Sequence, residues 1–195
     1  MRKFLLVQIA VALALAAPSA GFAAQNGRPV SVPQDRTAQV DKLLDELKKQ
    51  HNETAARRVA QRLQATWSES GSASVDLMMG WAQKAISQQK FDVALDFLDQ
   101  VVMLKPDYVE GWNRRATVHY LMHNFGMSMA DLNQALSLEP RHFGALSGVA
   151  RIMSETDNKE LALKAWEKVL AVYPMMRSAQ EQVSTLSEDL TGSAI

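Results

Sequence analysis

The sequence predicts an all-α protein in which similar helical hairpins stack side by side. Three prolines, Pro106, Pro140 and Pro174, recur every 34 residues, and a fixed period of this size is typical of helical repeat proteins. The 195 residues include only six Pro and nine Gly, so that few positions interrupt long helices. An apolar fraction of 47% and a charged fraction of 22% are those of a globular chain and not of a disordered one.

The repeat is visible in further columns of the alignment that the prolines define. Placing each proline at position 32 gives three units, 75–108, 109–142 and 143–176. Position 8 is alanine in every unit, position 20 is small, and positions 4 and 24 are large and apolar. Small residues let the two helices of a hairpin approach closely, and large residues fill the space around that contact. Each proline ends a helix, because its ring and its missing N–H prevent the helix from continuing.

These columns resemble the tetratricopeptide repeat (TPR), a helix-turn-helix unit of 34 residues. The resemblance covers residues 75–176 and departs at position 11, where an aromatic residue is usual and Ala85, His119 and Met153 stand. It implies a right-handed α-solenoid of three TPR units, in which short helices that are marginal alone stabilise one another by stacking.

Both flanks of the repeats also predict helices. Residues 35–74 contain two runs with apolar residues at helical spacing, Gln39–Lys49 and Glu53–Trp67, which indicates an N-terminal helical pair. We expect this pair, a possible divergent repeat, to cap the first unit. Residues 177–195 predict a C-terminal capping helix with a frayed end, because polar residues such as Glu181 suit an outer face in water.

The start of the chain has the three parts of a secretory signal peptide. A short basic start precedes the apolar run Phe4–Ala17, and small residues follow up to Ala23. The run of about 14 residues is shorter than the roughly 20 that a membrane-spanning helix needs. We therefore expect cleavage of residues 1–23 near Ala23, a flexible linker over 24–34, and a periplasmic or secreted mature protein without a stable membrane span.

The TPR resemblance also implies a binding surface. In this family the first helix of each hairpin lines a concave groove, and positions 2, 5, 9 and 12 of that helix commonly face the ligand. Position 2 holds Asp76, Glu110 and Gly144. The candidate groove residues at positions 5, 9 and 12 are Met79, Gln83 and Ile86 in the first unit, Asn113, Thr117 and Tyr120 in the second, and Ser147, Arg151 and Ser154 in the third. Their amide, hydroxyl, thioether and aromatic groups suit the backbone and the apolar side chains of an extended peptide. The alternative is an ordinary solvated helix face.

Composition and motifs restrict the other classes of function. Lysine plus arginine and aspartate plus glutamate both number 21, and the resulting net charge of zero argues against a nucleic-acid partner. The absence of cysteine excludes disulfides and thiolate metal sites. No GxSxG motif, P-loop or Gly-rich dinucleotide turn occurs, so we expect neither an enzyme nor a cofactor. The prediction is an exported, non-catalytic scaffold or adaptor that binds a protein or peptide in its groove and serves cell-envelope assembly.

Two other functions remain open. One is a structural protein that self-associates through Met175 and Met176 or through the first helical pair, so that the chain is a monomer or a weak homo-oligomer. The other is a metal-binding protein that uses His119 and His123, which lie four residues apart on one predicted helix. A metal site of this kind needs three or four ligands, and the sequence suggests no others nearby.

Arg115 stands at position 7, where the TPR pattern usually has an apolar residue. Its hydrocarbon stem can pack inside while the guanidinium reaches an acid or the surface. A structural role is favoured over ligand contact, because a buried arginine is rarely left unpaired.

Overall fold

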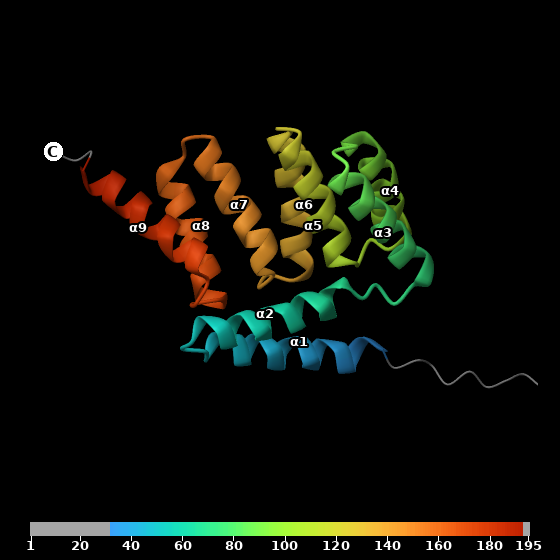
Figure 1. Ribbon diagram of the computed structural model, residues 1–195, viewed down its shortest axis with the longest axis horizontal. Coiled ribbons are helices and arrows are strands. Elements are labelled where there is room, and N and C mark those ends of the chain that lie inside the picture. Colours follow the sequence, from blue (N-terminus) through green and yellow to red (C-terminus); the bar gives the residue numbers. More distant parts are fainter. Residues whose placement is uncertain (1–31, 193–195) are drawn as a thin grey trace, which may run out of the picture. The chain divides into compact units, whose positions relative to one another are not determined.

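The computed structural model describes residues 32–192, and all regular structure within that range is helical (Figure 1). In chain order the helices are α1 (Val32–Lys48), α2 (Glu53–Ser68), α3 (Ala73–Ser87), α4 (Phe91–Leu104), α5 (Val109–Leu121), α6 (Phe125–Leu138), α7 (Phe143–Glu155), α8 (Lys159–Val172) and α9 (Arg177–Gly192). The all-α prediction is confirmed for this part of the chain.

The predicted signal peptide, residues 1–23, lies outside the described residues, and so does most of the linker predicted over 24–34. Helix α1 begins at Val32, three residues inside that predicted linker. Among the helices of residues 32–192, none has both the length and the apolar character that crossing a membrane requires.

Three hairpins, α3–α4, α5–α6 and α7–α8, follow one another in the order of the predicted units (Figure 1). The predicted close contact inside each hairpin is confirmed, because the small residues of positions 8 and 20 are all buried. These residues are Ala82, Ala116, Ala150, Ala94, Ser128 and Ala162. The hydroxyl of Ser128 donates a hydrogen bond of 2.7 Å to the carbonyl oxygen of Ala116, so that this polar group is satisfied within the core.

The turn inside each hairpin uses the same backbone geometry. Gln89, His123 and Asp157 occupy equivalent positions and have φ angles of 58°, 58° and 57°. In the first hairpin, the N–H of Lys90 donates to the carbonyl oxygen of Ala85 at 2.9 Å. This is the hydrogen bond that closes a helix end when the residue before the donor is left-handed.

Neighbouring hairpins also pack closely against each other. Gly111, in the first turn of α5, has no room for a side chain, because a Cβ there would lie 2.8 Å from Cγ1 of Val101 on α4. At the other end of the stack, α9 packs on α8 through Ala179 and Leu186. Helix α9 therefore occupies the place that the first helix of a further unit would take.

The expectation for Arg115 is confirmed. Its Nε and Nη2 donate to the two carboxylate oxygens of Asp131 at 2.8 and 2.7 Å, and its Nη1 donates to Asp99 at 2.8 Å. The guanidinium carbon lies 5.0 Å from the centre of the Trp112 ring. The bidentate pair with Asp131 ties α5 to α6, and the contact with Asp99 ties it to α4, while the cation–π contact with Trp112 lies within α5.

The sequence predicted that the helical pair α1–α2 caps the first hairpin. In the structure the pair packs against the third hairpin instead. The apolar residues of both helices form one buried cluster with Phe143 and Tyr173. The ring centre of Trp67 lies 5.3 Å from that of Phe143, and Arg141 Nη2 lies 2.7 Å from Asp41 Oδ1. Figure 1 shows α1 and α2 running crosswise to the stacked hairpins. The periodicity reveals an apolar face, but it carries no information on which surface covers that face.

Candidate functional site

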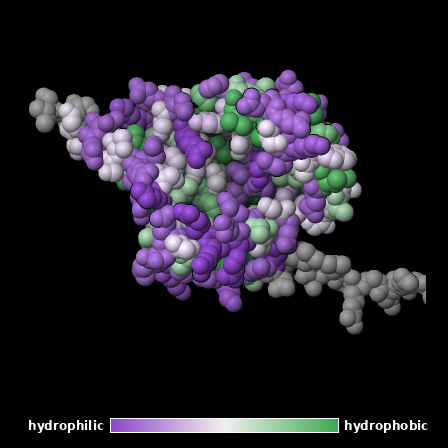
Figure 2. All heavy atoms as spheres, viewed as in Figure 1, coloured by the Kyte–Doolittle hydropathy of each residue, from purple (hydrophilic) through white to green (hydrophobic). Residues whose placement is uncertain are grey.

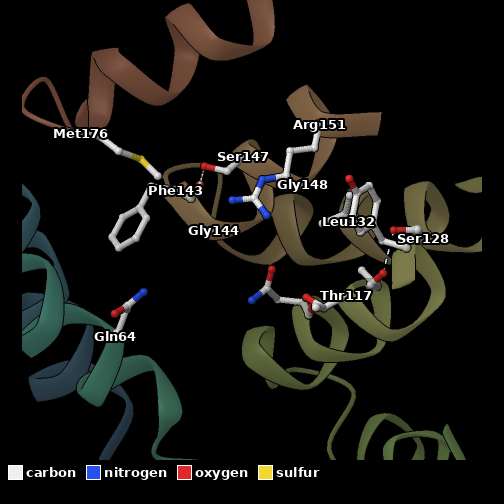
Figure 3. Close-up of a pocket in the computed structure, with 13 residues that line it drawn as sticks. Gln64, Thr117, Ser128, Leu132, Phe143, Gly144, Ser147, Gly148, Arg151 and Met176 are labelled. Atoms are coloured by element: carbon white, nitrogen blue, oxygen red, sulfur yellow. Dashed lines mark hydrogen bonds between the residues drawn. The ribbon is translucent and has the colours of Figure 1, made fainter. Parts of the chain in front are cut away.

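A hollow of about 260 Å³ lies where α5 and α7 meet the N-terminal pair. Its polar lining residues include Gln64, Asn113, Thr117, Tyr120, Ser147 and Arg151, and its apolar ones include Leu132, Phe143 and Met176. In Figure 3 the side chain of Arg151 extends from α7 into the hollow, while Gln64 approaches from α2. Figure 2 shows pale and green atoms at the floor of a recess between more polar rims.

A second hollow, of about 280 Å³, shares Tyr120 and Arg151 with the first. It is also lined by Ser154, Glu155, Trp166, Ser178, Glu181 and Gln182. Because α9 supplies the last three of these residues, the two hollows together extend over α5, α7 and α9. Arg151 and Tyr120 stand at the junction between them.

The structure brings together the predicted groove residues of the second and third units, but not those of the first. The residues that line one or both hollows are Asn113, Thr117, Tyr120, Ser147, Arg151 and Ser154. Met79 and Ile86 are partly buried among the apolar residues of the first hairpin. Gln83 accepts a hydrogen bond of 2.7 Å from Arg114 Nη1 through its Oε1 atom.

Sequence reasoning missed the lining residues that lie outside the three units. Helix α9 begins 34 residues after Phe143, so its positions 2 and 5 are Ser178 and Glu181, and extending the repeat by one helix would have found both. No comparable signal exists for Gln64, because α2 lies outside the repeat and reaches the hollow only by its crosswise packing.

The hydrogen-bonding capacity of the hollow is divided between acceptors and one strong donor group. The hydroxyl of Thr117 donates to the carbonyl oxygen of Asn113 at 2.9 Å, and that of Ser147 donates to Phe143 at 2.7 Å. Both hydroxyls therefore offer only lone pairs to a ligand. Within residues 32–192 the exposed guanidinium of Arg151 has no hydrogen bond or ion pair, so that its N–H donors remain available.

Tyr120 is held beside Arg151 by a hydrogen bond from its hydroxyl to Glu155 Oε1 at 3.1 Å. Burial, followed by the hydrogen bond to Glu155 and the charge of that residue, raises the pKa of Tyr120 above its ordinary value. The phenol consequently stays protonated at neutral pH and acts as a hydrogen-bond donor to Glu155.

A buried carboxylate orients the polar residues at the edge of the hollow. Glu110 accepts hydrogen bonds from Asn113 Nδ2 at 3.0 Å and from Arg114 Nη2 at 2.7 Å, and His142 Nε2 lies 3.4 Å from its Oε2. Burial opposes ionisation, but the neighbouring His142 imidazole, the charge of Arg114 and the hydrogen bond from Asn113 outweigh it and lower the pKa of Glu110. Because Arg114 also binds Gln83, this network connects α3, α5 and α7.

His142 links the same network to the N-terminal pair. Its Nδ1 accepts a hydrogen bond of 3.1 Å from the backbone N–H of Ala145 at the start of α7. Because Nδ1 accepts this bond, the ring carries a proton on Nε2, the nitrogen that faces Glu110. The ring centre of His142 lies 4.2 Å from that of Trp67 on α2, so that the docking of the pair and the orientation of Glu110 are physically coupled.

The two histidines of the metal-binding alternative have other neighbours. His119 is buried, with Nε2 3.9 Å from Asp131 Oδ2. His123 is exposed in the left-handed turn, and its ring contacts Phe125 edge-on. In the described part of the chain, no three His, Asp or Glu side chains gather closely enough to hold a metal ion.

Comparison with known proteins gives a close relative and several similar folds. No protein-family model matches the chain. A TPR repeat-containing protein of Rhizobium etli is 43% identical over 198 residues, which cover 98% of this chain and 97% of that protein.

Solved structures with similar folds are less similar in sequence. The first TPR of Spaghetti (RPAP3) bound to the HSP90 peptide SRMEEVD has a TM-score of 0.58 at 22% identity and covers 62% of this chain and 95% of that chain. The TPR2B domain of yeast Sti1 in its pHsp70 complex has a TM-score of 0.56 at 15% identity, and the match covers 60% of this chain and 99% of that chain. A crystal structure of MamA has a TM-score of 0.55 at 14% identity, and the match covers 79% of this chain and 82% of that chain. The predicted α-solenoid fold is confirmed by these likenesses.

Proposed function

The chain belongs to the tetratricopeptide-repeat protein family, and we propose that it is a non-catalytic scaffold that binds a protein or peptide along α5, α7 and α9. The observation that carries this proposal is Arg151, whose guanidinium points into a hollow and has no hydrogen-bond or ion-pair partner within the described residues. The structures of similar fold include TPR domains solved with the HSP90 peptide SRMEEVD and with pHsp70, which supports a peptide-like ligand.

The chemistry of the lining fits an extended polypeptide segment. Such a segment presents backbone N–H donors and carbonyl acceptors in alternation. Thr117 and Ser147 offer acceptors, Arg151 offers donors, and Phe143 and Met176 supply apolar surface for side chains. A site that combines apolar walls with a few oriented polar groups suits selective binding.

The N-terminal pair limits how such a ligand enters. Gln64 of α2 lines the first hollow, and Trp67 anchors α2 beside it through His142 and Phe143. Helix α2 therefore borders the hollow on one side, and the ligand extends from it toward Tyr120 and α9. We expect the end or a turn of the partner's chain, and not a segment running straight through, at Gln64.

Site-specific crosslinking in living cells tests this proposal. A photoreactive residue is placed at Gln64 or Gln182, which line the hollows, or at exposed Gln134 on α6, which lines neither. We expect the same protein to be crosslinked from the first two sites and not from the third. The substitution Arg151→Ala should abolish that crosslink, whereas Arg58→Ala, at an exposed arginine away from the hollows, should not. A partner captured equally well from Gln134, or insensitive to Arg151→Ala, would contradict the proposed site.

We also propose that the scaffold is exported and works in assembly of the cell envelope. The support is the basic start, the apolar run Phe4–Ala17 and the small residues up to Ala23, which together form the pattern of a cleaved signal peptide. Mass spectrometry of the protein from a periplasmic fraction should find Ala24 at the N-terminus. A cytoplasmic protein that retains Arg2 and Lys3 would contradict export.

A further inference from the structure

Helices α5, α7 and α9 each bury the same three positions of the repeat, 3, 7 and 10, against the hairpin before them. These residues are Gly111, Arg115 and Val118 in α5, Ala145, Val149 and Ile152 in α7, and Ala179, Val183 and Leu186 in α9. All of them are buried or partly buried. Stacking of this kind is what stabilises a repeat protein, because no single hairpin can bury its own apolar faces.

Helix α3 leaves the same positions uncovered. They hold Leu77, which is 53% exposed, Trp81, which is 46% exposed, and the exposed Lys84. The Trp81 ring contacts Phe97 of its own hairpin, at 5.3 Å between ring centres, but the N-terminal pair packs on the third hairpin instead. We refer to Leu77, Gly80, Trp81 and Lys84 as the α3 face.

The residue at position 3 argues against an ordinary repeat unit as the occupant of this face. In α5 that position is Gly111, where a Cβ would already lie 2.8 Å from Val101. Leu77 is too large for a neighbour that stacks at this separation. The far end of the stack offers no apolar counterpart either, because α9 exposes the polar residues Gln182, Thr185 and Glu188.

The α3 face complements a second copy of itself in the antiparallel orientation. Helix α3 is acidic in its first turn, at Asp76, and basic in its last turn, at Lys84, so that antiparallel pairing sets each Lys84 near Asp76 of the other copy. Parallel pairing would instead place like charges together. A Cβ at Gly80 would meet nothing within 4 Å, and this open surface can receive the bulky ring of Trp81 from the second copy.

We propose that the protein forms a twofold-symmetric dimer through antiparallel packing of two α3 faces, with the axis near Gly80 and Trp81. A closed, isologous contact of this kind is the commonest way in which identical chains associate. Neither hollow is lined by a residue of α3, so the dimer leaves both open and presents two copies of the candidate groove. A partner with two binding segments would then gain avidity from the pair. The dimer does not depend on what the groove binds.

Cysteine crosslinking tests the position of the axis. The chain has no cysteine, so that one introduced thiol reports on one site. The substitution Gly80→Cys should give a disulfide-linked dimer under mild oxidation, because the two thiols would lie next to the axis. The control is Met103→Cys on α4, at a side chain that is 79% exposed but lies outside the α3 face. Crosslinking that is no faster for Gly80→Cys than for Met103→Cys would overturn the proposed axis.

Sedimentation equilibrium tests the contact itself. At micromolar concentration the protein should sediment as a dimer, and Trp81→Ala should weaken the association by about tenfold or more. Met127→Ala, at a side chain 55% exposed on α6, should leave it unchanged. Lys84→Asp should weaken the dimer by setting two acids together, and the added change Asp76→Lys should restore it. The proposal is refuted if the protein stays monomeric at micromolar concentration, or if the dimer tolerates Trp81→Ala.

Discussion

Replacing Glu110 by Gln is expected to lower the free energy of unfolding by about 2 kcal/mol at neutral pH, the scale of hydrogen bonds to a charged group. The carboxylate accepts from Asn113 and Arg114, with His142 close to its second oxygen. Glutamine has a similar shape, but its amide turns one acceptor into a donor that faces other donors. This loss of stability is smaller than the loss on breaking a fully buried ion pair, because the Arg114 side chain is 33% exposed. Water can therefore replace part of the lost hydrogen bonding to Arg114.

The effect of this substitution should depend on pH in a defined direction. The pKa of Glu110 is lowered, because the partners that favour its charged form outweigh burial. A carboxyl group with a lowered folded-state pKa stabilises the protein above its unfolded-state pKa. That stabilisation disappears as the pH falls through the folded-state pKa. The difference in free energy of unfolding between the native protein and Glu110→Gln should therefore have its full size at neutral pH and shrink in acid.

Urea unfolding followed by circular dichroism over a series of pH values measures this difference. Glu181→Gln is the matched control, because Glu181 pairs with Arg177 on the exposed surface of α9; it should cause no measurable change. A loss for Glu110→Gln that is the same in acid as at neutral pH would show that shape, and not charge, determines the effect. The absence of any loss at neutral pH would refute the account of the network.

Other substitutions probe the packing of the stack. Gly111→Ala should destabilise the protein by about 1–3 kcal/mol, because its Cβ would lie 2.8 Å from Val101. Gly126→Ala, whose Cβ meets nothing within 4 Å, should not destabilise, and equal losses in urea unfolding would argue against the close stacking. Gln89→Gly should stabilise by about 0.5 kcal/mol, because relief of the left-handed φ exceeds the entropy cost of glycine; a lower midpoint of thermal unfolding would contradict this reasoning. Trp67→Ala should cost about 3–5 kcal/mol and speed hydrogen exchange in α1 and α2, and unchanged exchange there would disprove the anchoring role.

The sequence predicted the interior of the hairpins well, since the relevant contacts are local and recur with the period. Alanine at position 8 signals a close helix contact in every unit, and all three alanines are buried. The pairing of Arg115 with an acid could be expected from its position, because a partly buried guanidinium requires one. The identity of that acid, Asp131, emerged only when α6 was placed beside α5.

The candidate groove was predictable only in part. The TPR resemblance implied that Asn113, Thr117 and Arg151 lie on one side of the stack, and all three line the first hollow. It could not reveal that Met79 is drawn into the apolar interior of the first hairpin, because the same thioether suits an exposed groove or a core. It also could not reveal Gln64, which reaches the hollow from a helix outside the repeat.

The sequence alone determined the helices, their pairing into hairpins and the order of those hairpins. These features depend on residues less than one period apart, and short-range periodicity records such contacts. The tertiary structure decided where α1 and α2 dock, which hollow α2 borders and which face of α3 remains uncovered. Each of these depends on contacts between distant segments, such as Trp67 with His142. An apolar face gains nearly the same free energy from any apolar surface that fits it, so only the assembled shape selects its partner.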